Sequence, residues 1–187
     1  SALDITEQKK AEEALRASEA RYRELADHLP VGIYEADFDG KVNYANNTAM
    51  EMFGFSAVEV EKGVNFLAVI VPEDRETAIR NTRSIREGTP LVYQEYTMLR
   101  RDGSRFPTLT RSRPISRNGR IVGSSGTVTD ISELKRVQEA LRKNEALLGS
   151  ILKAAPIGVG IVHDRVLGWV NEGMTAMTGY AVEEIQG

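Results

Sequence analysis

LVYQEYTMLRRDGSRFPTLTRSRPISRNGRIVGSSGTVTD, residues 91–130, carries the clearest structural pattern of the chain. Two pairs within it, Asp102-Gly103 and Asn118-Gly119, are the residue types preferred in tight turns between antiparallel strands. These turns separate three predicted strands, at Leu91–Arg101, Arg105–Ile115 and Arg120–Asp130. The sequence therefore predicts a three-stranded antiparallel meander.

The preceding residues predict a second hairpin and a group of short helices. Residues 31–38 and 41–44 form two predicted strands, and Asp39-Gly40 is the turn between them. Helices are expected at 47–53 with Asn46 as N-cap, after the capping box Ser56-Ala-Val-Glu59, and from Pro72 to about Glu87. Five antiparallel strands with helices on one face make an α+β arrangement.

An internal repeat organises the rest of the chain. Asp4–Glu19 and Asp130–Glu145 are identical at nine of sixteen positions. The match resumes farther on, where Tyr44-Ala45-Asn46 corresponds to Trp169-Val170-Asn171. The repeating unit therefore comprises one domain and its linker, and the second copy is expected to be cut off before its fold closes.

Both linkers are predicted to be helices with apolar residues at heptad spacing. In the second linker, Val137, Asn144 and Ile151 share one core position, and Leu134, Leu141, Leu148 and Ala155 share the other. The first linker has Ala11, Ser18 and Leu25 at one position and Gln8, Leu15, Tyr22 and Leu29 at the other. A single polar seam residue such as Asn144 fixes register in parallel dimers. The pattern favours a dimeric coiled coil; the alternative is a single helix packed on its own domain, with Asn144 marking a break.

The composition excludes several classes of function. Cysteine is absent, and the two histidines, His28 and His163, have no partner at metal-ligand spacing. A net charge of −3 gives no basic footprint for nucleic acid. The longest apolar run, Phe66–Val71, falls far short of the ~18 residues that span a bilayer. We therefore expect no metal site, no nucleic-acid partner, no membrane segment in this chain and, because no catalytic set of residues is present, no enzyme.

Four motifs, in their order, resemble the PAS family. Pro30–Asp37 and Val42–Asn46 resemble the opening of a PAS domain, and Arg100–Pro107 resembles a hairpin of its C-terminal motif. Ile121–Ser132 is similar to the last strand running into the signalling linker, with Asp-Ile-Ser as exit signature. The resemblance implies a five-stranded PAS sheet with short helices on one face, flanked by coiled-coil linker helices. The expected parts are a linker helix (1–24), a complete PAS domain (25–131), a second linker helix (132–155) and the truncated N-terminal half of a second PAS domain (156–187).

The exit signature also has a physical interpretation. Asp130 lies where a strand ends and a helix begins, so its carboxylate is placed to accept hydrogen bonds from free helical amides, and Glu133 is placed to complete a reciprocal cap. The resemblance adds a role in signal transmission for Asp130, Ile131, Ser132, Glu133 and Asn144. The alternative is a plain helix cap.

The resemblance implies a sensory and dimerisation input module of a bacterial, cytoplasmic signal-transduction protein. A downstream output domain, of the histidine kinase (two-component) or cyclic-dinucleotide cyclase type, is expected in the full-length protein. The chain is expected to form a homodimer through its linker helices and the PAS surface. The alternative is a constitutive dimerisation or interaction scaffold that binds no ligand.

Analogy with other PAS folds also predicts which residues face an internal pocket. These are Tyr34, Ala49, Phe53, Ile79, Tyr96, Thr110 and Thr127. A covalent flavin adduct requires Cys, and a haem held from the long helix requires a His within residues 72–87; the sequence has neither. No cofactor is therefore predicted. A noncovalent small ligand and a fully packed core remain the two alternatives.

Overall fold

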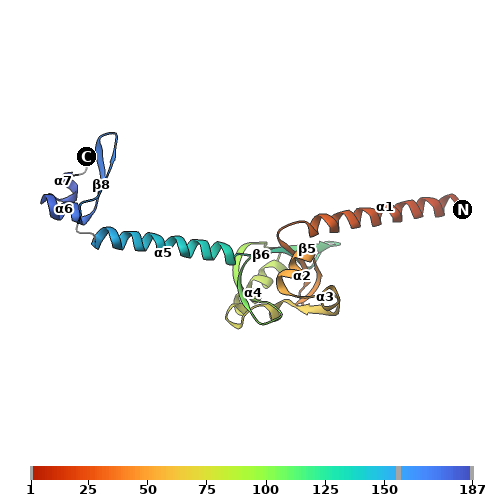
Figure 1. Cartoon of the computed structure of the whole chain (residues 1–187). Helices are drawn as coiled ribbons and strands as arrows, with labels where there is room; N and C mark the ends of the chain where they lie inside the picture. The colour runs from red at the N-terminus through yellow and green to blue at the C-terminus, as the bar shows by residue number, and fades with distance from the viewer. Residues whose placement is uncertain (1, 155–156, 186–187) are drawn as a thin grey trace. The chain divides into compact units, whose positions relative to one another are not determined.

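The computed structural model describes residues 2–154 and 157–185 (Figure 1). The chain divides into two compact units, Ser1–Ser132 and Glu133–Gly187. The elements of the first unit are α1 (Ala2–Asp27), β1 (Gly32–Asp37), β2 (Lys41–Ala45), α2 (Asn47–Phe53), α3 (Ala57–Gly63), β3 (Val64–Asn65), the 3₁₀ helix η1 (Phe66–Val69), α4 (Pro72–Arg86), β4 (Leu91–Leu99), β5 (Arg105–Arg117) and β6 (Arg120–Asp130).

The strands of the first unit form one antiparallel sheet in the order β3-β2-β1-β6-β5-β4. Strands β4, β5 and β6 are consecutive neighbours, which confirms the predicted meander. Between β5 and β6, Asn118 and Gly119 have φ angles of 51° and 74°. Positive φ at both central residues matches the twist of the flanking strands, so this pair makes a tight hairpin without splaying the sheet.

The sheet has one strand more than the sequence predicted. Val64 and Asn65 of β3 pair with Val42 and Lys41 of β2. A strand of two residues is too short to produce an alternating pattern, so periodicity could not reveal it. The predicted α+β class is confirmed, with a six-stranded sheet in place of five strands.

Helices α2, α3 and α4 lie on one side of the sheet (Figure 1). Their predicted caps are present: the Asn46 side chain accepts from the Ala49 amide, and Ser56 and Glu59 form a reciprocal capping box. Between these helices and the sheet lies a hydrophobic core, whose buried members are Ile70, Ala78, Tyr96, Met98, Phe106 and Val128. The caps fix where each short helix begins, and the core sets which face it turns to the sheet.

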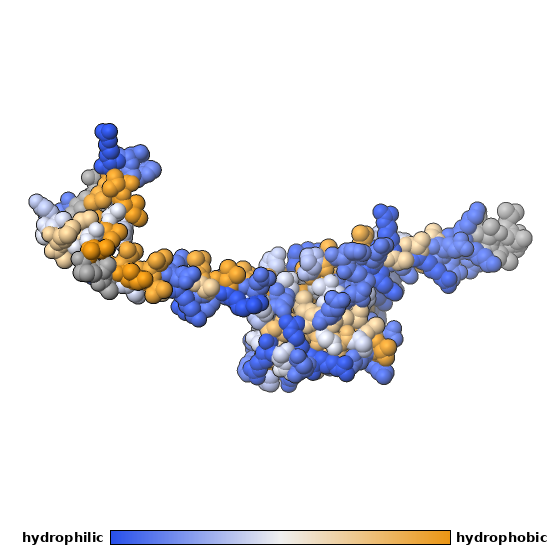
Figure 2. Space-filling view, viewed as in Figure 1, coloured by the Kyte–Doolittle hydropathy of each residue, from blue (hydrophilic) through white to orange (hydrophobic). Residues whose placement is uncertain are grey.

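The second unit contains α5 (Ser132–Ala154), β7 (Gly160–His163), β8 (Val166–Val170), α6 (Glu172–Thr178) and α7 (Val182–Ile185). Strands β7 and β8 pair with each other in a sheet of two strands. Ile161 and Val162 are each 61% exposed. Figure 2 shows apolar side chains gathered on the surface of this unit.

The linker helices leave their predicted seam residues uncovered in a single chain. In α1, the exposed seam residues are Leu15, Tyr22 and Leu25, and in α5 they are Leu134, Val137, Leu141, Leu148 and Ile151. Helix α5 runs without interruption through Asn144. Ala155 of the predicted seam lies outside the described residues. The coiled coil itself stays a prediction.

Candidate functional site

A cavity of about 120 Å³ lies between the sheet and helices α2 and α4 of the first unit. Five of the seven residues predicted to face a pocket line it: Tyr34, Ala49, Phe53, Tyr96 and Thr110. They come from β1, α2, β4 and β5, so segments far apart in the sequence meet around one small space.

The other two predicted lining residues, Ile79 and Thr127, lie elsewhere. Ile79 is 48% exposed and borders a different hollow, which lies between α4, η1 and the turn that joins β1 to β2. Thr127 pairs with Arg111 and Ile33 across the sheet. Directly paired residues point to the same face, and the Thr127 side chain therefore shares the outer face with exposed Arg111. The lining prediction was wrong for both positions.

Sequence reasoning missed several polar residues of the cavity lining. Ser112 of β5 hydrogen-bonds the Tyr34 hydroxyl at 2.5 Å, and Asn81 of α4 donates to the Tyr96 hydroxyl at 2.7 Å. Burial raises the pKa of Tyr34 to about 12, against the opposing effect of the Ser112 hydrogen bond. The phenol therefore stays neutral at physiological pH. Polar residues spaced along β5 and α4 resemble surface positions in the sequence. The polar and apolar pattern therefore did not identify them as lining residues.

One polar group of the cavity has no partner. Thr110 is 4% exposed, and its Oγ1 atom makes no hydrogen bond in the described structure. Thr108, two residues earlier on the same strand, is fully buried and donates from Oγ1 to the Tyr96 carbonyl at 3.1 Å. A buried hydroxyl without a partner costs free energy and calls for an explanation.

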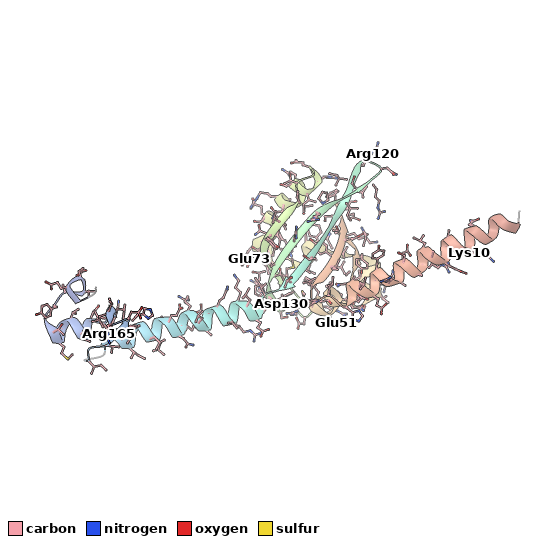
Figure 3. The ribbon with its side chains drawn as sticks, turned by 90° about the horizontal axis from the view of Figure 1, so that it is seen from above. Lys10, Glu51, Glu73, Arg120, Asp130 and Arg165 are labelled. Atoms are coloured by element: carbon pink, nitrogen blue, oxygen red, sulfur yellow. The ribbon has the colours of Figure 1, made fainter. Side chains whose placement is uncertain are left out.

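A second polar cluster lies at the junction between β6 and α5. Figure 3 labels Asp130 at this end of the sheet. Asp130 accepts from the Ser132 amide through Oδ1 at 2.8 Å and from Arg100 Nη2 through Oδ2 at 2.6 Å. The other Arg100 nitrogen, Nη1, donates to the Met52 carbonyl of α2. Arg100 therefore joins the helix layer to the exit of the sheet, and sequence reasoning did not single it out.

Arg100 also lies over an aromatic ring of the core. Its guanidinium carbon is 3.9 Å from the centroid of the Phe106 ring, a cation–π geometry. Phe106 in turn meets Phe53 edge to face, with centroids 5.4 Å apart. Since Phe53 lines the cavity, a continuous series of contacts runs from the cavity to Asp130.

The charge state of Asp130 depends on these neighbours. Burial by itself raises the pKa of this carboxyl, but the hydrogen bonds from Ser132 and the Arg100 guanidinium outweigh it and hold the pKa below its ordinary value. The carboxylate is therefore ionised at neutral pH. Ile131 is buried and donates its amide to the Pro107 carbonyl, whereas Glu133 and Asn144 are exposed on α5. The reciprocal cap from Glu133 stays a prediction.

Asn46 forms a third cluster, where the end of α1 meets the start of the sheet. Its Oδ1 accepts from the amides of Ile33 and Ala49, and its Nδ2 donates to the carbonyls of Ala26 and Val31. At 1% exposure it is among the most buried side chains of the chain. Its role as N-cap was predicted from the sequence, but not its link to the entering helix.

Within residues 2–154 and 157–185, no three His, Cys, Asp or Glu side chains gather as a metal ion requires. No helix in these ranges combines the length and apolarity needed to cross a membrane. Neither histidine lines the cavity.

The family model with the description "PAS fold" matches residues 20–131. The chain belongs to the PAS family. PAS domains are non-catalytic sensory modules, and the fold agrees with solved members. The PAS domain of a protein from Colwellia psychrerythraea has a TM-score of 0.55 at 24% identity, covering 61% of this chain and 97% of that one.

Two curated relatives of this PAS protein are sensor proteins. The C4-dicarboxylate transport sensor protein DctS of Rhodobacter capsulatus is 26% identical over 91% of this chain and 26% of its own length. The sensor protein FixL of Bradyrhizobium diazoefficiens is 25% identical over 95% of this chain and 35% of its own length. The chain thus spans about a quarter to a third of these relatives.

Proposed function

We propose that residues 25–131 are the sensory input domain of a larger signalling protein, and that the cavity passes its state to the linker through Arg100 and Asp130. The observation that carries this proposal is the series of contacts Phe53, Phe106, Arg100, Asp130. It begins at the cavity wall and ends at the residue whose carboxylate binds the first amide of α5.

The proposed relay shifts an equilibrium between two packings of the same side chains. A ligand that presses on Phe53 moves this ring against Phe106, and Phe106 supports the guanidinium of Arg100. Arg100 also holds the Met52 carbonyl of α2, so a shift of that helix reaches the same cation. A ligand shifts the balance only by the difference in its affinity for the two packings.

The proposed receiver of the signal is a parallel pair of α5 helices. The apolar seam of α5 is uncovered in one chain, with Leu141 58% and Leu148 59% exposed. A second copy of the chain covers the same stripe on both helices at once, in the register that Asn144 favours. We propose a homodimer through the linker helices and the PAS surface, with residues 156–187 beginning a second PAS domain.

The output of the full-length protein is proposed from its relatives. Both are named as sensor proteins, and this chain covers only part of each. A histidine kinase or a cyclic-dinucleotide cyclase downstream of the linker, working in the cytoplasm, is the expected arrangement. The alternative is a constitutive dimerisation scaffold, in which the conformation of the linker does not depend on the sheet or on the state of the cavity.

The absence of cysteine gives a clean test of the relay. Asn144→Cys places the sole thiol of the chain in the proposed seam, where a parallel, in-register pair of helices forms an intermolecular disulfide. In this background we expect Arg100→Lys to change the rate of disulfide formation several-fold, because Lys keeps the charge but loses the fork geometry and the stacking on Phe106.

The matched control is Arg101→Lys. Arg101 is the neighbouring residue, but its side chain is 61% exposed and pairs with Glu59 on the surface. The control is expected to crosslink at the background rate, and both variants are checked for an unchanged melting temperature. Equal rates for the two variants contradict the relay and favour the scaffold. No disulfide in the Asn144→Cys protein contradicts the parallel pair.

A further inference from the structure

The size of the cavity restricts what can occupy it. Its volume is about 120 Å³. Sites for drug-sized ligands measure roughly 300 Å³ or more, whereas an apolar cavity of about 150 Å³ holds a single benzene molecule. An occupant of this cavity is therefore a molecule of only a few non-hydrogen atoms.

The chemistry of the walls restricts the occupant further. None of the residues that line the cavity is an Asp, Glu, Lys, Arg or His. An anion placed there loses its hydration shell without gaining a counter-ion, which is strongly unfavourable. Most of the wall is aliphatic or aromatic, including Val42, Val60, Ile70 and Phe66. The walls therefore suit a neutral, mainly apolar molecule.

One wall oxygen is fully buried and still lacks a hydrogen bond in the described structure. The Tyr34 and Ser112 hydroxyls are bonded to each other, and the Tyr96 hydroxyl accepts from Asn81. Thr110 Oγ1 alone is buried without a partner among the described residues. A hydroxyl both donates and accepts, so it is satisfied by an alcohol or a carbonyl group.

We propose that the cavity binds a small neutral alcohol or carbonyl compound whose oxygen hydrogen-bonds Thr110 Oγ1, and that it rejects carboxylates. This inference rests on the proposed function, in which the cavity is the input site. It sets this chain apart from a sensor of dicarboxylates, although one of its relatives is named for C4-dicarboxylate transport.

The experiment compares four probes on the 187-residue protein by NMR titration of signals from the cavity walls. The probes 1-butanol and 1-fluorobutane have nearly the same shape and differ in the hydroxyl, while butyrate and succinate carry negative charge. We expect 1-butanol to bind with a Kd of about 1 mM, because the binding free energy of a ligand is limited by its small number of non-hydrogen atoms. It should bind roughly five-fold more tightly than 1-fluorobutane, and the anions should leave the wall signals unchanged.

Two threonine variants on one strand separate recognition from folding. Thr110→Val replaces the unpartnered hydroxyl with a methyl group, so it should abolish the preference for 1-butanol and raise the melting temperature of the empty protein. Thr108→Val removes a hydroxyl that bonds the Tyr96 carbonyl, so it should lower the melting temperature and keep the preference. The opposite signs of the two temperature changes show that the variants report on different roles.

Three results overturn the inference. They are binding of butyrate or succinate in the cavity, an unchanged 1-butanol preference in Thr110→Val, and a cavity that takes none of the probes and holds only water. The crosslinking test of the relay uses no ligand. A failure of the ligand class with an Arg100-dependent crosslink therefore leaves the proposed function standing, and an Arg100-independent crosslink removes that function whatever the cavity binds.

Discussion

Two asparagines, one in each unit, make the same set of hydrogen bonds. Asn171 Oδ1 accepts from the amides of Val159 and Met174, and Nδ2 donates to the carbonyls of Leu152 and Ile157. Asn46 bonds the corresponding groups of the first unit, also two amides and two carbonyls. In both units the asparagine ties the end of a long helix to the first strand and the following short helix.

What surrounds the two junctions is very different. Strand β1 of the first unit lies between β2 and β6, and β2 pairs on its far side with β3. Strands β7 and β8 of the second unit pair only with each other among the described residues, and most of their apolar side chains are exposed, although Val170 is buried. The junction is therefore a local structure that about thirty residues build alone. The cavity and the buried sheet depend on the distant strands β4, β5 and β6.

The largest predicted effect of this difference is on the free energy of unfolding when a glycine of each sheet is replaced by alanine. A Cβ on Gly126 of β6 lies 2.2 Å from the Arg111 carbonyl and 2.9 Å from the Tyr34 hydroxyl, whereas a Cβ on Gly168 of β8 comes no closer than 4.0 Å to the Ile161 carbonyl. Gly126→Ala should therefore lower the free energy of unfolding by about 3 kcal/mol, through displaced backbone and loss of the Tyr34–Ser112 bond.

Urea unfolding of the first unit measures this change, and Gly168→Ala is the matched control. We expect the control to change the free energy of unfolding by less than about 0.5 kcal/mol, as is usual for open surface positions. A Gly126→Ala protein as stable as the control means that the strands around Tyr34 are more loosely packed than these Cβ distances indicate.

A smaller effect is expected at the two junctions. Asn46→Ala removes four hydrogen bonds at a site that is 1% exposed, and should cost the first unit about 2 kcal/mol because buried amides and carbonyls lose their partners. Asn171→Ala removes the same bonds from a two-stranded hairpin whose strand β7 is exposed along its length. We expect it to leave the urea transition of the first unit unchanged and to raise amide hydrogen exchange across residues 157–178. If Asn171→Ala lowers the stability of the first unit as much as Asn46→Ala does, the two units are not independent.

The sequence predicted those features that local chemistry determines. The turn at Asn118-Gly119, the Asn46 cap and the capping box at Ser56 and Glu59 all follow from residues within a few positions of each other. The α+β class and the meander followed from these turns. The lining role of Tyr34 and Ala49 came from the family resemblance and the alternation along the first strand.

The misplaced residues depend on register and on helix rotation. A bulge between Ile115 and Ser116 shifts β5 against β6, so that Val128 and not Thr127 lies beside Thr110. A slip of one residue reverses the face of every side chain in a strand, and the sequence pattern does not show where a bulge falls. The prediction for Ile79 was wrong for a different reason. The inward face of α4 carries the polar residues Asn81 and Thr82 between the buried Ala78 and Ile85, so its apolar stripe is interrupted in the sequence.

The smallest predicted effect concerns Asp130, the last residue of β6 before the linker helix α5. Its pKa is lowered in the folded state, so its hydrogen bonds stabilise the fold when the pH is above the ordinary carboxyl value and are lost as the pH falls through the folded value. We expect this contribution, about 1 kcal/mol for a partly exposed pair, to begin to fall near pH 4 and to be lost once the pH has passed below the lowered pKa.

Asp130→Asn tests this directly, because it keeps the shape of the side chain but cannot be ionised. The free energy of unfolding of the first unit, measured between pH 7 and 3, should fall less steeply in Asp130→Asn than in the wild type. The control is Asp164→Asn, in the turn between β7 and β8, whose side chain is 90% exposed. It should show the same fall in the free energy of unfolding at acid pH as the wild type.

Parallel curves for Asp130→Asn and the wild type mean that the Arg100–Asp130 pair adds nothing to stability. Any role of the pair then lies in orienting the exit of β6, which the crosslinking of Asn144→Cys measures separately.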